Sequence, residues 1–171
     1  MAAAVARVRI FKLTMIGAIA VLSVMPRAMA APAEDAAWKA TSHDVVKGLG
    51  RCYVEPRHKQ SWRLSGDHLI WETRSLGRVK VDRRAEVPIA IIERATLGRA
   101  ADAPGYPYMV EMRLERAVTA AATVGGQFNP DFNYETATLA CALKKEGDAE
   151  RLKDAINHLI ELARGNHAPP R

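Results

Sequence analysis

The segment "QSWRLSGDHLIWETR", residues 60–74, constrains the fold most strongly, because two alternating runs flank the dipeptide Gly66-Asp67. A two-residue connection with glycine first is typical of a β-hairpin with a type II′ turn. Such a turn sets the register, so Ser65 lies opposite His68 and every further pair follows from that one. The sequence therefore predicts an antiparallel hairpin whose facing residues are known one by one.

This register divides the side chains of the hairpin between two faces. One face carries Trp62, Leu64, Leu69 and Trp71, and the other carries Arg63, Ile70, His68 and Glu72. The first set suits a buried sheet face, and the second suits solvent. His58 shares the face of the tryptophans and falls near Ser75 if the pairing extends that far. His58 and His68 therefore lie on opposite faces and cannot share a metal ion.

The first thirty residues have the features of a secretory signal peptide. A basic start is followed by an apolar run from Leu13 to Met25 and by the small-residue pattern Ala28-Met29-Ala30. We expect cleavage near Ala30 and a periplasmic or secreted protein. An uncleaved membrane anchor is the alternative, although the run is shorter than the ~20 residues that a spanning helix needs.

Removal of this segment changes the charge of the chain. It takes away four of the 25 basic residues and none of the 19 acidic ones, which leaves a net charge of +2. Nucleic-acid recognition needs a concentrated basic face, so we expect no nucleic-acid partner. The expected partner is a protein or another envelope component of unknown identity, with membrane-surface contact and oligomeric state left open.

The two cysteines, Cys52 and Cys141, both lie in the exported part of the chain. In an oxidising compartment they admit one intramolecular disulfide. Buried free thiols, or pairing with another chain, are the alternatives. Their spacing matches no zinc motif, and we expect neither a metal nor a cofactor.

The chain divides into four segments by pattern. Residues 1–30 are the signal, 31–50 a linker and N-terminal helix, 51–165 one sheet-and-helix domain, and 166–171 a disordered tail. Trp38, Val45, Val46 and Leu49 recur near helical spacing, which predicts a short helix within 34–50. A shorter helix that begins near His43, capped by Thr41 or Ser42, is the alternative.

Several further strands follow the hairpin. We expect them at 78–82, 87–97, 109–124 and 134–145, with loops at 98–108 and 127–133. The 87–97 strand has a break at Pro88 as its alternative. The 109–124 run is either one long bent strand or two strands.

The last segment of the domain predicts an amphipathic helix. Its apolar residues recur at spacings of three and four, and they are Leu152, Ala155, Ile156, Leu159, Ile160 and Ala163. Asp148 is the expected N-cap and Gly165 the expected stop. The fold class is therefore α+β, with a strongly bent antiparallel sheet or partly open barrel, a short N-terminal helix and a closing C-terminal helix.

This order of elements resembles the pleckstrin-homology-like fold over roughly residues 50–164. The resemblance rests on "SWRLSGDHLIW", the short strands after it, and "EGDAERLKDAINHLIELA" after the last strand. It implies that the final helix plugs one end of the bent sheet. Some members bind phosphoinositides through basic residues around the first hairpin, and Arg57, Lys59 and Arg63 lie near that place. The short turn with Asp67 departs from the long basic loop of those members, so no binding site is carried over.

No enzymatic motif is present. A Gly-x-Ser-x-Gly elbow and a phosphate-cradling glycine loop are absent from the sequence. Ser65, Asp67 and His68 are neighbours on the hairpin, where a catalytic relay is difficult to form. We therefore expect a non-enzymatic binding or structural module. A small periplasmic hydrolase with an unrecognised carboxylate or histidine site is the alternative.

Two aromatic loops are the remaining candidates for binding. They contain Tyr106, Tyr108, Phe128, Phe132 and Tyr134 in turn-rich sequence. Aromatic side chains on loops suit recognition, and the alternative is that they fold back onto the core. A sheet face or a sheet edge is the other surface through which such a module acts. A lipid-headgroup binder is a further alternative, which requires one patch from Arg57, Lys59, Arg63, Lys80, Arg83 and Arg84.

Overall fold

The hairpin forms in the predicted register. Strands β1 (His58–Ser65) and β2 (His68–Ser75) pair antiparallel, with Ser65 opposite His68 and Trp62 opposite Trp71. Gly66, the first residue of the turn, has φ +58°. Asp67, the second, does not have a positive φ, because Arg57 is the one residue other than glycine with a positive φ in the described part of the chain. Only the first residue of the turn is therefore left-handed, as a type II′ turn requires. Pairing extends to His58 opposite Ser75.

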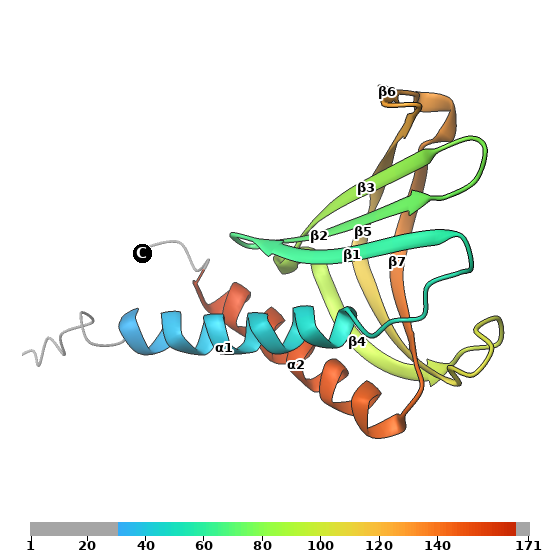
Figure 1. Ribbon diagram of the computed structural model, residues 1–171. Helices are drawn as coiled ribbons and strands as arrows, with labels where there is room; N and C mark the ends of the chain where they lie inside the picture. The colour runs from blue at the N-terminus through green and yellow to red at the C-terminus, as the bar shows by residue number, and fades with distance from the viewer. Residues whose placement is uncertain (1–30, 167–171) are drawn as a thin grey trace, which may run out of the picture.

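The computed structural model describes residues 31–166 (Figure 1). The predicted signal peptide at 1–30 and the tail beyond Asn166 lie outside the described residues. No helix within 31–166 is both long and apolar enough to cross a membrane.

The rest of the sheet is built around one long strand. Its elements are β3 (Val81–Pro88), η2 (Ile89–Ile91), β4 (Ile92–Arg99), β5 (Tyr108–Val124), β6 (Gln127–Phe128), η3 (Pro130–Phe132) and β7 (Tyr134–Leu143). Strand β3 pairs with the second half of β5 and β4 with the first half, while β7 also pairs with β5. The break after Pro88 and the single long strand β5 are the two predicted alternatives that the structure adopts.

One strand begins later than predicted. The expected strand at 78–82 is a turn up to Lys80, and β3 begins at Val81. The hydroxyl of Ser75 donates to the carbonyl of Val79 and accepts from the amide of Val81, which closes the turn. These side-chain bonds compete with extension of the strand.

The pairing of β5 with β7 is interrupted by a register shift. The register against β7 shifts between Arg113 and Val118. Over this interval β5 advances by five positions, whereas β7 advances by only two, from Thr138 to Thr136. In the first half of β5, Val110, Met112 and Leu114 are buried in the main core. The shift curls the sheet strongly, which confirms the predicted α+β class with a bent antiparallel sheet.

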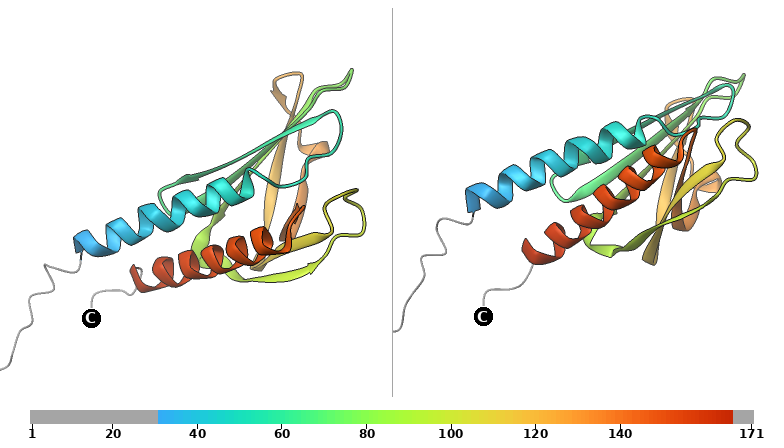
Figure 2. Two further views of the ribbon diagram at one scale, coloured as in Figure 1. Left: turned by 60° about the horizontal axis from the view of Figure 1, so that its bottom comes forward. Right: turned by 90° about the horizontal axis from the view of Figure 1, so that it is seen from below.

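Two helices lie side by side and antiparallel on one side of the sheet (Figure 2). They are α1 (Ala31–Leu49) and α2 (Glu146–Asn166). The Thr41 hydroxyl lies 3.1 Å from Nδ1 of His158, and Gly48 packs on Leu152. Thr41 precedes Gly48 in α1, whereas His158 follows Leu152 in α2, so the helices run in opposite directions.

Both helices begin earlier than predicted. The expected linker "APAED" is the first part of α1, and the alternative start near His43 is wrong. Alanine favours helix, and proline is tolerated in a first turn. Helix α2 begins at Glu146, so Asp148 lies in its first turn and is not the N-cap. Hydrogen bonding from Arg151, with Arg51 also nearby, lowers the pKa of Asp148, and a carboxylate there is favoured by the helix dipole.

The disulfide joins Cys52 to Cys141, as predicted, and closes a loop across 89 positions of sequence. It links the segment after α1 to β7, where the amide of Tyr53 also donates to the carbonyl of Ala142 at 2.8 Å. Cys141 is buried in the main core. The covalent link therefore fixes α1 and the start of β1 against the last strand.

Reduction of this disulfide should lower the free energy of unfolding by about 4–5 kcal/mol, because the loop that it closes is long. Urea unfolding with and without reductant measures the loss. The Cys52→Ala/Cys141→Ala double variant is the control and should not respond to reductant. A mass spectrum without reductant that shows two free thiols would contradict the link.

The close contact of the helices at Gly48 makes a second prediction. A Cβ there would lie 2.7 Å from Cδ1 of the buried Leu152, whereas Gly165 has open space around it. Gly48→Ala should destabilise by about 1–3 kcal/mol through overpacking. Gly165→Ala should be neutral or stabilise by up to about 1 kcal/mol through helix propensity. Equal midpoints in thermal unfolding would contradict the close packing.

Candidate functional site

The concave face of the first three strands changes from apolar to polar along its length. Rows of facing residues cross these strands, and the rows are Leu64–Leu69–Val87, Trp62–Trp71–Ala85, Gln60–Thr73–Arg83 and His58–Ser75. Leu69, Val87 and Trp62 are buried in the main core with the helices. The row of Arg83 and the row of His58 lie beyond that core, so their polar groups reach a surface hollow.

This hollow is a cleft of about 400 Å³, which we call the seam cleft. One side is formed by His58, Gln60, Trp71, Thr73 and Arg83, and the other by Met109, Ala140 and Ala142. Tyr53–Glu55 and residues 100–103 complete its lining. Among the described residues, β1 pairs only with β2, and no ladder joins β1 to β7. The cleft thus occupies the place where the curled sheet does not close.

The edge of β7 that faces away from β5 is only partly satisfied. The carbonyl of Ala142 accepts from Tyr53, and the hydroxyl of Thr136 bonds both the amide and the carbonyl of Thr138. Backbone groups of alternate strand residues point to the same edge. Ala140 lies between these positions, so its amide and carbonyl are open to the cleft.

Arg83 is the most distinctive group of the cleft. Its guanidinium carbon lies 5.8 Å from the ring centre of Tyr134, which meets Trp71 edge to face at 6.3 Å. Nε of Arg83 is buried and has no hydrogen-bond partner in the described structure. Burial raises the pKa of Tyr134, and the nearby Arg83 opposes this shift, so the phenol stays neutral near pH 7. The ring therefore holds the cation by its face and adds no negative charge.

His58 is a second polar group of the cleft. Its Nδ1 is buried without a hydrogen bond and lies 3.7 Å from Oε2 of Glu55. That distance allows attraction when the imidazole is protonated, but it exceeds a hydrogen bond. The cleft thus combines polar groups that lack partners with apolar walls from Trp71 and Met109.

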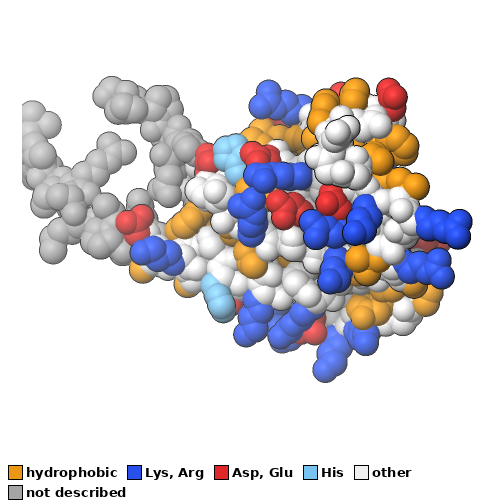
Figure 3. All heavy atoms as spheres, turned by 45° about the horizontal axis from the view of Figure 1, so that its top comes forward, with side chains coloured by type: hydrophobic (Ala, Val, Ile, Leu, Met, Phe, Trp, Pro, Cys, Tyr) orange, Lys and Arg blue, Asp and Glu red, His pale blue; other side chains and the backbone are white. Residues whose placement is uncertain are grey.

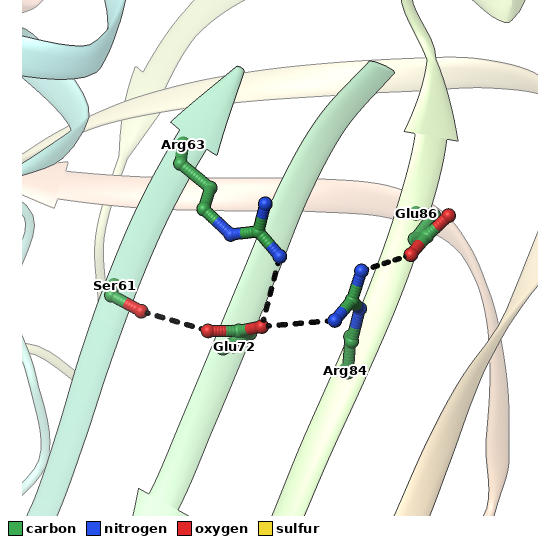
Figure 4. A network of polar contacts seen from close by, with 5 residues as sticks. All are labelled: Ser61, Arg63, Glu72, Arg84 and Glu86. Atoms are coloured by element: carbon green, nitrogen blue, oxygen red, sulfur yellow. Dashed lines mark hydrogen bonds and ion pairs between the residues drawn. The ribbon is translucent and has the colours of Figure 1, made fainter. Parts of the chain in front are cut away.

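The opposite, outer face of the same strands is arranged differently. Figure 4 shows Glu72 between Arg63 and Arg84, with Ser61 and Glu86 at the ends of the network. These side chains surround Ile70, which is only 3 % exposed although it lies on the outer face. A hollow of about 560 Å³ is lined from both faces, by ion-paired residues of the outer face such as Arg74 and Asp82 and by Gln60, Thr73 and Arg83 of the concave face. Acidic and basic groups are interspersed on this side of the molecule (Figure 3).

The basic residues of the lipid-headgroup alternative do not share one face. Lys59, Arg63 and Arg84 belong to the outer face, whereas Arg83 belongs to the concave face. Arg63 and Arg84 already pair with Glu72. Arg57 precedes β1 in a left-handed conformation, where its carbonyl accepts from the amide of Leu76. This arrangement does not support a single lipid-binding patch.

The two aromatic loops are placed differently. Tyr106 packs on Tyr53, with ring centres 5.1 Å apart, and Lys144 lies over its ring. Tyr108 begins β5 beneath Arg99. In contrast, Phe128 and Phe132 are 64 % and 44 % exposed. The first loop therefore folds back onto the domain, and the second presents its aromatic rings to solvent.

Ser65, Asp67 and His68 do not form a hydrogen-bonded relay in the described part of the chain. Asp67 and His68 pair at 2.7 Å beside the hairpin turn, but no hydrogen bond joins His68 to Ser65 there. None of the hollows described above includes these three residues. Within residues 31–166, no group of three His, Cys, Asp or Glu side chains could hold a metal ion.

The row formed by Gln60, Thr73 and Arg83 was not predicted from the sequence. The hairpin register places Gln60 opposite Thr73, and this part was available from the sequence. Arg83 was considered only as a lipid contact, because the register of β3 depends on the length of the 76–80 turn. The alternation in "VDRRAEV" is the signal, since it gives Arg83 the parity of the buried Ala85 and Val87.

Comparisons with known proteins give no relative for this chain. No family model, no curated protein and no solved structure matches it. Its function must therefore be argued from the geometry of the cleft.

The two faces of the hairpin should respond differently to substitution. Trp62→Ala should destabilise by about 3–5 kcal/mol, because the indole is 8 % exposed and packs in the core. Glu72→Gln should cost less than about 1 kcal/mol, since its ion pairs are solvent-exposed. Urea unfolding of both variants measures the contrast. Comparable losses would contradict the assignment of the faces.

Proposed function

We propose that this protein is an exported, non-enzymatic binding module that holds a short extended polypeptide segment in the seam cleft. The observation that carries the proposal is the open backbone edge at Ala140, which lies in a cleft with partly apolar walls. An open strand edge binds an extended segment through main-chain hydrogen bonds, and neighbouring pockets then select its side chains. The occupant is a partner protein or another polypeptide component of the envelope.

The expected export is consistent with the cysteine chemistry. A disulfide between two buried cysteines suits an oxidising compartment such as the periplasm. The basic and apolar N-terminal pattern, with its expected cleavage near Ala30, supports the same location.

The proposed fold relationship is with the pleckstrin-homology-like fold. A curled antiparallel sheet followed by a C-terminal amphipathic helix supports it. The additional helix α1, fixed by the disulfide, distinguishes this domain from the simple pattern. The relationship assigns no ligand, so the binding proposal rests on the cleft alone.

The length of the open edge limits the segment that the cleft accepts. Tyr53 covers the edge at Ala142, and Thr136 covers it at Thr138. Of the residues between them, only Ala140 points its backbone groups to this edge. The volume of about 400 Å³ is at the lower end of the range for ligand pockets. Both features favour a segment of a few residues over a full added strand.

Photo-crosslinking in the native compartment tests this function. A benzophenone side chain at position 140 should form a discrete adduct with one short segment of a partner, because that position lines the cleft. The matched control is position 121, an alanine on the outer face of β5. A synthetic peptide of the captured segment should then slow hydrogen exchange at the Ala140 amide. Identical adducts from both positions, or an unprotected Ala140 amide, would reject the proposal.

A further inference from the structure

We propose that the seam cleft recognises a carboxylate group, which binds to the guanidinium of Arg83. This inference rests on the proposed function, because it names the chemistry of the segment that the same cleft holds. The carboxylate is a chain terminus or an acidic side chain of the bound segment. The juxtaposition that carries the inference is an unpaired, oriented arginine beside an aromatic wall and an open strand edge.

Arg83 differs from the arginines on the outer face of the same strands in its lack of an acidic partner among the described residues. Arg63, Arg74 and Arg84 on the outer face each have an acidic partner within 3.5 Å. Arg83 has no acidic partner among the described residues, and its Nε is buried without a hydrogen bond. A buried donor without a partner is costly, so the folded protein retains a group that an acceptor would satisfy.

The second argument is the way in which Arg83 is oriented. The ring of Tyr134 lies beside the guanidinium, and Trp71 supports that ring by an edge contact. Ala122 lies opposite Arg83 across the ladder and is fully buried, so the neighbour of the Arg83 side chain on β5 is a closely packed residue. A guanidinium that is fixed in this way loses little entropy when it forms two parallel bonds to a carboxylate.

The third argument is the polar set around the guanidinium. Thr73 lies directly opposite Arg83, and Gln60 lies opposite Thr73 on the next strand. Both line the cleft and can bond a carboxylate or the adjoining peptide group. His58, from the neighbouring row, adds a ring nitrogen, Nδ1, that is buried and has no hydrogen bond.

The charges of the cleft favour a carboxylate over a phosphate. Glu55 and Asp102 line the same cleft, and they repel a doubly charged phosphate more strongly than a singly charged carboxylate. No residue of the first turn of α1 or α2 lines it, so the helix N-terminus that often binds phosphate is absent from this site. One guanidinium matches the single charge of a carboxylate.

Nuclear magnetic resonance titration of the isotope-labelled, disulfide-intact protein tests this inference. The probe is benzoate, and its neutral control is benzamide. Benzoate should shift the indole N–H of Trp71 and the amide of Thr73 in a saturable way, with an affinity about tenfold or more above that of benzamide. Equal affinity for the two probes would overturn the carboxylate assignment. Inorganic phosphate is the third probe, and tighter binding of phosphate than of benzoate at these resonances would also overturn it.

A matched pair of arginine variants locates the site. Arg83→Gln should weaken benzoate binding about tenfold or more, whereas Arg84→Gln, on the opposite face, should leave it unchanged. Unchanged spectra away from the cleft establish that both variants are folded. Full retention of benzoate binding by Arg83→Gln would overturn the role of this residue.

The carboxylate inference and the proposed function fail in different ways. If crosslinking at position 140 captures a segment but benzoate and benzamide bind alike, the function stands and the carboxylate assignment falls. If benzoate binds through Arg83 but no polypeptide is captured and no Ala140 amide is protected, the cleft binds a free carboxylate. That second outcome supports the anion site and rejects the polypeptide partner.

Discussion

The register shift in β5 is the constraint on which the rest of the structure depends. Before the shift, Val110 and Met112 face the helices, and after it Ala120 and Ala122 face the concave side of the hairpin. The buried residues of β5 have the same parity on both sides of the shift, so one concave face continues from the core to the hairpin. The shift changes the parity of β7 instead, so that Cys141 lies in the helix-covered core whereas Tyr134 lies beside Arg83 at the uncovered cleft.

The cleft follows from the way in which the apolar rows end. Trp62 is within the core, Trp71 is partly buried, and the next row is Gln60, Thr73 and Arg83. The two indole rings lie 6.1 Å apart, and Trp71 continues the contact to Tyr134. The aromatic chain therefore joins the core to the cleft, so the position of Arg83 is set by packing that also stabilises the fold. A site supported in this way is rigid before any ligand arrives.

The parts of the structure that were predictable from sequence are those with local rules. The hairpin register follows from Gly66-Asp67, the disulfide from the presence of two cysteines in a chain that is expected to be exported, and α2 from its apolar spacing. The row through Arg83 requires the register of β3, which depends on side-chain bonds in the 76–80 turn. The register shift between β5 and β7 depends on pairing between residues far apart in sequence, so no local sequence pattern predicted it. The cleft depends on both the register of β3 and the shift in β5, and it could therefore not be predicted from the sequence.

The edges of an unclosed sheet are a hazard, because they offer unpaired backbone groups to other chains. In this protein, Tyr53 covers one position of β7 and Thr136 covers another, so the edge is protected on both sides of Ala140. A uniform defence against aggregation would cover Ala140 as well. Instead, the open position at Ala140 faces a cleft that contains Arg83, the one arginine of the first three strands without an acidic partner among the described residues. The edge is covered on both sides of Ala140, and an arginine without an acidic partner lies in the cleft that Ala140 faces. Together these features favour selective binding over accidental exposure of the edge.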